Sequence, residues 1–289
     1  MSSKVLMIGG TGLAGLPVAR RLKQDGFDVT IMTTNVERAR AKLGDQFGLV
    51  QGDVTHPESL SAPMEKADIV FLNLNSGFDP ALYEAIEIRG TMNCAWTARR
   101  SNIKRIGMIS GASSEGVEKG IIFLDAKVKA EHALMESGVP FTIMRPSWFF
   151  ESLPSFVQGG RAGVFGKQPI PRAWLALKDY ARQVSTALAS EEAADKCFYN
   201  YGPVKMTLLE AVERFCERFH PEVKPESVSF MKAKMLTLVP GMSGLKRALP
   251  FFQYMETQPE DGSPDEAERI LGPNLTTLEE WMDEYQPAQ

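Results

Sequence analysis

The glycine-rich stretch near the N-terminus constrains the fold more than any other feature of the chain. In "VLMIGGTGLAG" (residues 5–15) an apolar run leads directly into Gly9-x-x-Gly12-x-x-Gly15, and a helical pattern begins inside the motif. In such a unit the first glycine permits a sharp turn, the second lets backbone N–H groups approach a pyrophosphate, and the third lets the helix pack close to the sheet. The helix N-terminus adds unpaired donors and the positive end of its dipole.

Tight glycine turns also occur without a ligand. Here, however, the strand, the helix and the next strand all fall where a dinucleotide-binding unit requires them. We therefore predict a phosphate cradle formed by Gly9, Thr11, Gly12, Leu13, Ala14 and Gly15.

Short apolar runs alternate with helical patterns through the first half of the chain. The strand candidates are residues 4–9, 28–33, 47–53, 68–74, 105–110 and 140–145, and helical patterns cover 13–25, 36–43, 57–66, 80–100 and 125–137. Apolar strands that each lead into a helix indicate a parallel sheet covered on both faces. Right-handed crossovers make this an α/β fold with a doubly wound, Rossmann-type sheet, which binds ligands at the carboxyl ends of its strands.

The alternation loosens after about residue 150. We predict a dinucleotide-binding domain over residues 1–150 and a smaller substrate or lid region over 151–289, with a strand at 196–202 that returns to the main sheet. Residues 156–174 are rich in Gly and Pro and suit a loop that reaches over a site.

Helix signals continue in this second region. Helical patterns cover 178–190 and 207–219, and Asp179 and Thr207 are predicted to be N-caps or near-caps. After a Met-rich stretch at 230–242, either Thr276 or Thr277 is placed to cap a final helix.

Composition excludes several classes of protein. Apolar and charged residues make up 44% and 24% of the chain, the net charge is −4, and no basic run is longer than two arginines, so nucleic-acid binding is not predicted. No apolar run approaches the roughly 18 residues of a membrane span. The N-terminus enters a strand pattern at once, which leaves no room for a signal peptide, and we expect a cytoplasmic protein. The cysteines are widely spaced and the three histidines lack ligand spacing, so buried free thiols and no metal site are predicted.

The end of the second strand should determine the choice of dinucleotide. An NAD site usually carries an acidic residue there for the ribose 2′-OH. This chain instead has Thr33, Thr34 and Asn35, with Arg38 one turn into the next helix, and these groups suit a 2′-phosphate. The alternative is that Arg38 and Arg40 are only exposed helix charges. We predict NADP as the cofactor, in preference to NAD.

The ends of the third and fourth strands meet the same crevice. Asp53 and Val54 follow the third strand, where an acidic and an apolar side chain can contact the adenine amino group and ring. Asn73, Leu74 and Asn75 end the fourth strand beside that site.

Two lysines in "FLDAKVKAEHAL" (residues 123–134) differ in helical phase. Lys129 falls on a side that water should solvate, whereas Lys127 falls at the edge of the apolar stripe. Two interpretations of Lys127 are open: it meets a ligand, or it extends to the surface and pairs with Glu131 four residues on.

With these residues placed, the chain resembles the short-chain dehydrogenase/reductase superfamily, and more closely its atypical, NmrA-like branch of quinone and isoflavone-type reductases and non-catalytic redox sensors. The resemblance rests on "GGTGLAG", "GDVTHPESL", "IRGTMNCAWTARRSNIKRIGMIS" and, most specifically, "AKVKAEHALMESGVPFTIMRPSWFFES". It covers about residues 4–200 and thins beyond them.

The resemblance implies roles for several residues. The superfamily's catalytic Tyr-x-x-x-Lys falls on Phe123-x-x-x-Lys127, so Lys127 would face the nicotinamide ribose while the phenol is absent. The catalytic serine would lie in "SGASSEG", where Ser110, Ser113 and Ser114 are the candidates and we predict Ser113, although a Ser/Gly turn can equally be plain loop chemistry.

The segment after the sixth strand would line the nicotinamide end through Pro146, Ser147 and Trp148. Trp148 to Phe150 are three adjacent aromatic residues, which cannot all face one core. Either at least one of them lines a pocket, or they divide between core and surface.

Two functions follow from different classes. The first is a reductase that passes hydride from NADPH to a small apolar conjugated acceptor of the quinone or enone type, because delocalised acceptors need less help from a positioned acid and so tolerate Phe123. The second is a non-catalytic redox sensor whose NADP occupancy sets its conformation and partner choice, which the missing phenol favours. The cradle itself does not discriminate between them, and the sequence fixes neither the acceptor nor the oligomeric state.

Overall fold

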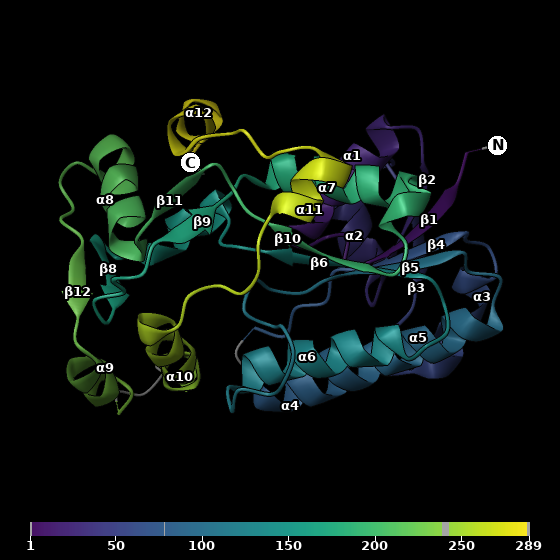
Figure 1. Ribbon diagram of the computed structural model, residues 1–289, viewed down its shortest axis with the longest axis horizontal. Coiled ribbons are helices and arrows are strands. Elements are labelled where there is room, and N and C mark those ends of the chain that lie inside the picture. The colour runs from purple at the N-terminus through teal and green to yellow at the C-terminus, as the bar shows by residue number, and fades with distance from the viewer. Residues whose placement is uncertain (1, 78, 239–242, 288–289) are drawn as a thin grey trace.

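The computed structural model describes residues 2–77, 79–238 and 243–287. Within them, seven parallel strands form one sheet in the order β10-β6-β5-β4-β1-β2-β3 (Figure 1). Their bounds are β1 (Lys4–Ile8), β2 (Asp28–Thr33), β3 (Gly48–Gln51), β4 (Ile69–Leu72), β5 (Arg105–Ile109), β6 (Phe141–Pro146) and β10 (Lys196–Asn200). The predicted doubly wound Rossmann-type sheet is confirmed.

The strand order reverses at β1, which is the feature that creates the ligand crevice. Val5 of β1 pairs with Val29 of β2 on one side and with Ile69 of β4 on the other. The chain therefore leaves β1 toward β2 and β3, and later returns to build β4, β5 and β6 on the opposite side. The loops after β1 and β4 diverge at this switch point, so a crevice opens at the carboxyl ends of the two strands.

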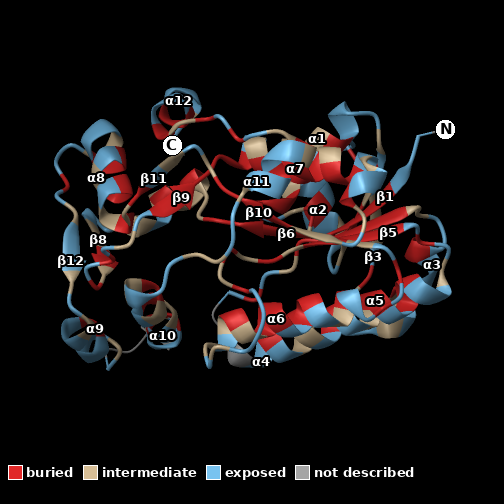
Figure 2. Ribbon diagram, in the orientation of Figure 1, coloured by how far each residue is buried: buried red, intermediate tan, exposed pale blue. Residues whose placement is uncertain are grey.

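Helices cover both faces of the sheet and turn their buried sides toward it (Figure 2). One face carries α1 (Gly15–Gln24), α2 (Val36–Leu43), α7 (Leu177–Ala189) and α11 (Asp265–Leu271). The other carries α3 (Ser61–Met64), α4 (Pro80–Leu82), α5 (Gly90–Arg100) and α6 (Ile122–Met135). Each face has its own apolar core, and residues such as Val18 and Leu134 are fully buried in them.

Two of the predicted helices are interrupted. Residues 57–66 form a 3-10 turn, η1 (Pro57–Ser59), and then the short α3, since Pro63 lacks an N–H donor for a continuous helix. Residues 80–100 contain a π-helical segment, η2 (Tyr83–Arg89), between α4 and α5. Such segments are rare and often lie at functional sites.

The chain beyond residue 150 builds a smaller lobe and also completes the sheet layers. Besides α7 and α11, the helices of this part of the chain are η3 (Phe150–Phe156), η4 (Glu191–Ala193), α8 (Leu208–Phe219), α9 (Phe230–Leu236), α10 (Ser243–Thr257) and α12 (Leu278–Glu284). A core of buried aromatic residues, among them Trp174, Phe215 and Trp281, holds the lobe together. Because α7, α11 and β10 pack with the main sheet, the division at residue 150 stays a prediction.

The prediction of a loop over residues 156–174 was wrong about the local structure of that stretch. That stretch contains β7 (Val157–Gln158), β8 (Arg161–Phe165) and β9 (Arg172–Trp174). β8 pairs with β12 (Glu226–Val228) and β9 with β11 (Val204–Met206). Both partners lie far along the chain, so local Gly and Pro content could not reveal the strands.

Thr207 and Thr277 are N-caps as predicted, whereas Asp179 is not. Thr207 and Thr277 each cap a helix, α8 and α12, through a reciprocal capping box with the glutamate three residues on. Asp179 is not the N-cap but a near-cap, because α7 begins after Ala176 and Asp179 lies in its first turn. Its carboxylate instead accepts hydrogen bonds from the backbone N–H groups of Leu275 and Thr276, which ties the C-terminal segment to α7.

Two further observations complete the fold. Residues 239–242, the end of the Met-rich stretch, lie outside the described residues. Among the helices that are described, none has both the length and the apolar character needed to cross a membrane.

Candidate functional site

The glycine motif forms a tight loop between β1 and α1. Gly9 has φ +81°, and a Cβ on it would lie 2.2 Å from the carbonyl oxygen of Asn73. A Cβ on Gly15 would lie 2.2 Å from the carbonyl oxygen of Gly9. A Cβ on Gly12 would meet nothing closer than 3.5 Å. The protein's own packing therefore requires glycine at positions 9 and 15, whereas the bare surface at Gly12 fits the close approach of a ligand.

The loop also presents unused hydrogen-bonding groups. Among the described residues, the backbone N–H groups of Leu13 and Ala14 donate to no protein acceptor, and Oδ1 of the buried Asn73 has no partner. Leu13, Ala14 and Asn73 line a groove of about 400 Å³. Its lining also includes Gly9, Thr11, Gly12, Leu74, Asn75 and Lys127. Free N–H groups at a helix N-terminus suit an anionic pyrophosphate, so the groove fits a dinucleotide.

Lys127 is buried, not at the surface. Its Nζ lies 2.6 Å from Oε2 of Glu87 in η2 and donates to the carbonyl oxygen of Leu74 at 3.3 Å. The proposed pair with Glu131 is wrong, because Glu131 makes a bidentate pair with Arg145 of β6. An ammonium has three donors, so one remains to face the groove. Lys129, by contrast, is exposed, as its helical phase predicted. It pairs with Glu118.

Glu87 is a residue that the sequence analysis missed. It is 2% exposed, its Oε1 accepts the N–H of Ser76, and it lines the groove beside Lys127. A buried lysine needs such a partner. The acidic residue lies 40 positions earlier on a different helix, and no local pattern connects the two.

The serines after β5 divide between different environments. Ser110 lines both the groove and the adjoining cavity, and its buried Oγ has no hydrogen-bond partner among the described residues. Ser113 lines the cavity alone, and Ser114 is fully buried outside both. Ser110 is thus the serine best placed to contact a ligand at the junction, although the prediction named Ser113.

The predicted adenosine contacts lie outside the groove lining. Asn35 caps α2, because its Oδ1 accepts the N–H of Arg38 at 2.8 Å. Val54 is buried in the core against Gly90, and Oδ1 of Asp53 accepts from Thr55. Thr33 is half-buried and Thr34 is exposed.

Two basic residues of α2 face the glycine loop from its open side. Arg38 is exposed, and Lys42, which sequence reasoning missed, donates from Nζ to the carbonyl oxygen of Thr11 at 2.7 Å. Residues four apart share a helix face, so Arg38 and Lys42 both lie toward the cradle. The spacing of the two cations in "RARAK" was the signal that could have revealed Lys42.

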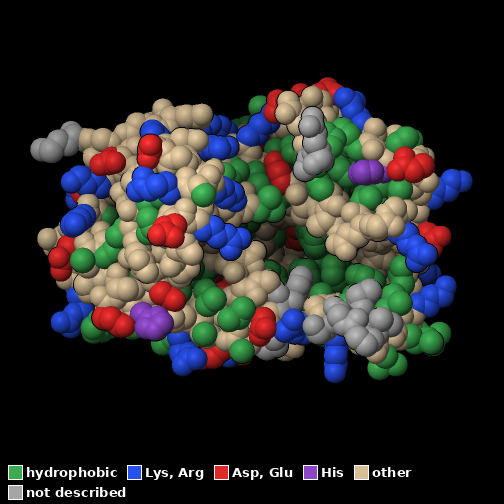
Figure 3. Space-filling view, turned by 180° about the vertical axis from the view of Figure 1, so that it is seen from behind, with side chains coloured by type: hydrophobic (Ala, Val, Ile, Leu, Met, Phe, Trp, Pro, Cys, Tyr) green, Lys and Arg blue, Asp and Glu red, His purple; other side chains and the backbone are tan. Residues whose placement is uncertain are grey.

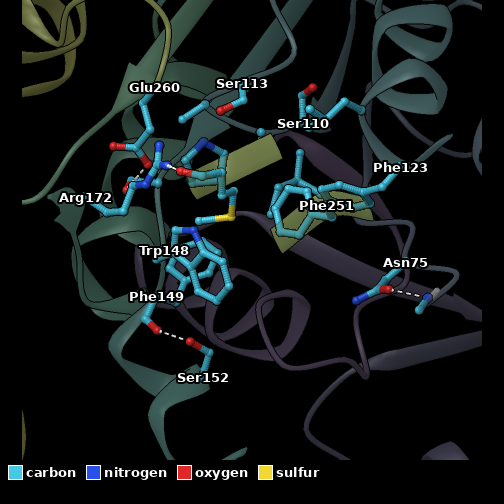
Figure 4. Close-up of a pocket in the computed structure, with 18 of the residues that line it drawn as sticks. Asn75, Ser110, Ser113, Phe123, Trp148, Phe149, Ser152, Arg172, Phe251 and Glu260 are labelled. Carbon is cyan, nitrogen blue, oxygen red and sulfur yellow. Dashed lines mark hydrogen bonds between the residues drawn. The ribbon is translucent and has the colours of Figure 1, made fainter. Parts of the chain in front are cut away.

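A second cavity of about 470 Å³ adjoins the groove, and the two share Asn75, Ile109, Ser110, Phe123 and Phe149. Its walls are aromatic. The ring of Phe251 from α10 meets Phe123 edge-on at 5.1 Å and stacks on Trp148 at 6.3 Å. Figure 4 shows these rings between Asn75 at one end and Glu260 at the other. Seen from behind, hydrophobic side chains gather around a hollow near the middle of the molecule (Figure 3).

The three adjacent aromatic residues divide between this cavity and the core. Trp148 and Phe149 line the cavity, while Phe150 is fully buried against Trp174 in the smaller lobe. The preceding Pro146 and Ser147 also line the cavity, where β6 ends.

The end of the cavity farthest from Asn75 is polar, and it contains residues that the sequence did not reveal. Arg172 of β9 and Glu260, which follows α10, lie together there (Figure 4). Glu260 accepts hydrogen bonds from Oγ of Ser147 and from the N–H of Ala173. Burial lowers the pKa of the Arg172 guanidinium, an effect that the nearby Glu260 opposes.

A family model described as NAD(P)H-binding matches residues 9–177, more than half of the chain. A photosystem II assembly factor, Ycf39 of Guillardia theta, is 26% identical over 152 residues, which are 52% of this chain and 48% of that protein. The chain thus spans about half the length of the first curated relatives that it matches.

Two solved structures share the fold across nearly the whole chain. The Citrobacter sp. triphenylmethane reductase complexed with NADP(H) aligns with a TM-score of 0.76 at 19% identity, covering 97% of this chain and 99% of that one. The NADPH-dependent quinone oxidoreductase of Escherichia coli complexed with NADPH gives a TM-score of 0.75 at 19% identity and the same coverage.

Proposed function

Because the chain belongs to the NAD(P)H-binding family, we propose that it is a reductase that uses NADPH to reduce a flat conjugated small molecule, such as a quinone or an enone. The observation that carries the proposal is the aromatic cavity of about 470 Å³ that opens directly onto the dinucleotide groove. Ligand sites are typically concave and mostly apolar, with a few polar groups that fix orientation. This cavity has that composition.

The groove residues would hold the cofactor in distinct ways. The N–H groups of Leu13 and Ala14 and the bare backbone at Gly12 would receive the pyrophosphate. Lys127, oriented by Glu87, would donate its remaining N–H to the nicotinamide ribose. Arg38 and Lys42 would meet a 2′-phosphate, which supports NADP over NAD. When bound, NADPH supplies a hydride at the junction of groove and cavity.

Phe123 determines which acceptors suit the site. It stands at that junction, and its ring packs with Tyr83 and Phe251. A phenyl ring supplies no proton, so a simple ketone, whose developing alkoxide needs a nearby acid, is a poor acceptor. A conjugated acceptor spreads the charge away from the point of hydride addition. It can also pack against the rings of Trp148 and Phe251, which line the cavity.

The test is NADPH oxidation, followed by absorbance, with quinones, enones and simple ketones of similar size. We expect turnover with the conjugated acceptors, saturation with each of them, and none with the ketones. The matched control is the Gly12→Val variant, which keeps the acceptor cavity but should not bind NADPH. Absence of turnover with every conjugated acceptor, while NADPH binding is intact, would rule out the reductase.

A second candidate is a redox sensor that binds NADP(H) without turnover. Phe123 in place of the phenol favours it, as does the resemblance to a protein named an assembly factor. Such a protein should change its sedimentation or partner binding between NADP and NADPH, whereas a reductase need not. Measuring both properties on one preparation separates the two candidates.

A further inference from the structure

Glu260 brings a carboxyl group into the cavity from a distant part of the chain. It follows α10 in sequence and contacts Ser147, which follows β6. Figure 4 shows Glu260 beside Arg172, at the opposite end of the cavity from Asn75. Oε1 accepts a hydrogen bond from Oγ of Ser147, and Oε2 accepts one from the N–H of Ala173 at 3.2 Å. The carboxyl group is therefore fixed at the end of the cavity opposite Asn75 and the cofactor groove.

The segment that carries Glu260 is firmly attached to the loop after β5. The N–H of Asp261 donates to the carbonyl oxygen of Ala112 at 2.7 Å. The Asp261 carboxylate accepts Nζ of Lys119 at 2.7 Å and the N–H of Glu115 at 3.2 Å. These bonds fix the backbone on one side of Glu260.

Arg172 fixes the other side of the segment. Its Nη2 donates to the carbonyl oxygens of Met255 at 2.5 Å and Gln258 at 2.8 Å. A group held this rigidly is preorganised for chemistry in the cavity.

The surroundings of Glu260 raise the pKa of its carboxyl group. Burial raises its pKa above the ordinary value, and the hydrogen bonds from Ser147 and Ala173 oppose the rise without cancelling it. Arg172 of β9 and Lys205 of β11 also face it and act in the lowering direction. Tyr201, after β10, stays neutral beside it, because burial raises the pKa of its phenol. A carboxyl group with a raised pKa can serve as a general acid nearer to neutral pH.

From this geometry we propose that Glu260 is the acid that protonates the acceptor, in place of the phenol that Phe123 lacks. The inference rests on the proposed reductase function and deepens it. Hydride enters the acceptor at the Phe123 end of the cavity, and conjugation carries the negative charge to a heteroatom at the opposite end. Glu260 lines that end, so an acceptor that spans the cavity brings its far oxygen to the carboxyl group.

The step balances as a two-electron reduction. The acceptor gains one hydride, which is a proton with two electrons, and NADPH becomes NADP. The O–H bond of Glu260 breaks, a new O–H bond forms on the acceptor, and the carboxylate remains. Water then returns a proton to Glu260, which is partly accessible to solvent. The preferred substrate class is therefore a conjugated acceptor with an oxygen remote from the carbon or oxygen that receives hydride, as in a para-quinone.

A purely structural role for Glu260 predicts different behaviour. In that case Glu260 only links Ala173 to Ser147. The amide oxygen of Gln could still accept the N–H of Ala173, and its NH2 could donate to Oγ of Ser147, because a hydroxyl can accept as well as donate. Glu260→Gln should then leave the rate and its pH dependence unchanged. If Glu260 is the acid, the amide has no proton of suitable acidity to give.

The experiment compares wild type, E260Q and E260D with a para-quinone and NADPH across pH. We expect E260Q to lower kcat about a hundredfold, the lower end of the usual general-acid contribution, with little change in KM. Because the protonated form acts, wild-type kcat/KM should fall as pH rises through the raised pKa of Glu260, and E260Q should lose that fall. E260D, which keeps a carboxyl group, should recover part of the rate. E268Q is the matched control, since Glu268 is an exposed carboxyl group of α11.

A second readout is independent of turnover. Difference infrared spectra of wild type and E260Q should show one carboxylic acid band that titrates at the pH where kcat/KM falls. Wild-type rate and pH profile in E260Q, or a carboxylate band throughout the pH range, would overturn the role of Glu260 while leaving the reductase intact. Wild-type protein inactive with every conjugated acceptor would overturn both.

Discussion

The dinucleotide groove and the acceptor cavity meet at Phe123, yet they are built in opposite ways. The groove takes most of its lining from two strand ends and one loop, residues 9–14 and 73–75, and its chemistry is largely that of the backbone. The cavity takes single side chains from Asn75 to Glu260, and its chemistry is that of aromatic rings and one carboxyl group. In a site made from backbone, a side chain added at one glycine can block the ligand. In a site made from side chains, the substitution of one residue can change which ligand is bound.

The largest effect should come from the groove. Gly12→Val should weaken the binding of both NADPH and NADH at least about a thousandfold, roughly 4 kcal/mol, because the branched side chain would occupy the space of the pyrophosphate. The fold should survive, since a Cβ at this position lies 3.5 Å from its nearest neighbour. Titration calorimetry measures the affinity. Gly244→Val is the matched control, because a Cβ on Gly244 meets nothing within 4 Å. Normal binding by Gly12→Val would remove the cradle assignment.

The same contrast explains what could be predicted from the sequence. The glycine motif, the alternation of strands and helices, and the family were predictable, because each rests on residues close in sequence whose spacing has a physical meaning. The cavity was not, because Arg172, Phe251 and Glu260 come from segments whose neighbours are set by tertiary packing. Glu87 was missed for the same reason, and the strand pairs β8–β12 and β9–β11 were as well.

Lys127 tests whether the groove also depends on side chains. Lys127→Met should lower the free energy of unfolding by about 3 kcal/mol, because it leaves the buried Glu87 without its counter-ion. Denaturant unfolding measures the loss, and Lys129→Met, at an exposed pair, should cost less than about 0.5 kcal/mol. The double variant Lys127→Met/Glu87→Gln should regain much of the stability but still bind NADPH weakly. If its NADPH affinity equals that of wild type, Lys127 is only a structural residue.

The cavity should show the reverse pattern, a change in the acceptor without a change in the cofactor. Phe251→Ala should raise the KM for a quinone about thirtyfold, roughly 2 kcal/mol, because the acceptor loses contact with one half-buried ring of the cavity wall. NADPH affinity should stay within twofold of wild type. Phe219→Ala removes a half-buried ring from the same lobe, away from the cavity, and controls for loss of stability. Equal weakening of acceptor and cofactor by Phe251→Ala would show that the two sites are not separable.

The smallest expected effect concerns the open edge of the groove, where Arg38 is exposed and water weakens any charge interaction. Arg38→Ala should weaken NADPH about tenfold, roughly 1.4 kcal/mol, and leave NADH unchanged, because only NADPH carries the 2′-phosphate. Lys42→Ala should act in the same direction, since Lys42 lies one turn later and already reaches the carbonyl oxygen of Thr11. Arg40→Ala is the control on the same helix, because Nη1 of Arg40 pairs with Oδ1 of Asp45 at 2.8 Å.

A series of salt concentrations sharpens the measurement. The effect of Arg38 should shrink as ionic strength rises, because exposed charges are screened, while the effect of Gly12→Val, which is steric, should not. Equal losses for NADPH and NADH in Arg38→Ala would mean that this edge of the groove does not distinguish the two cofactors.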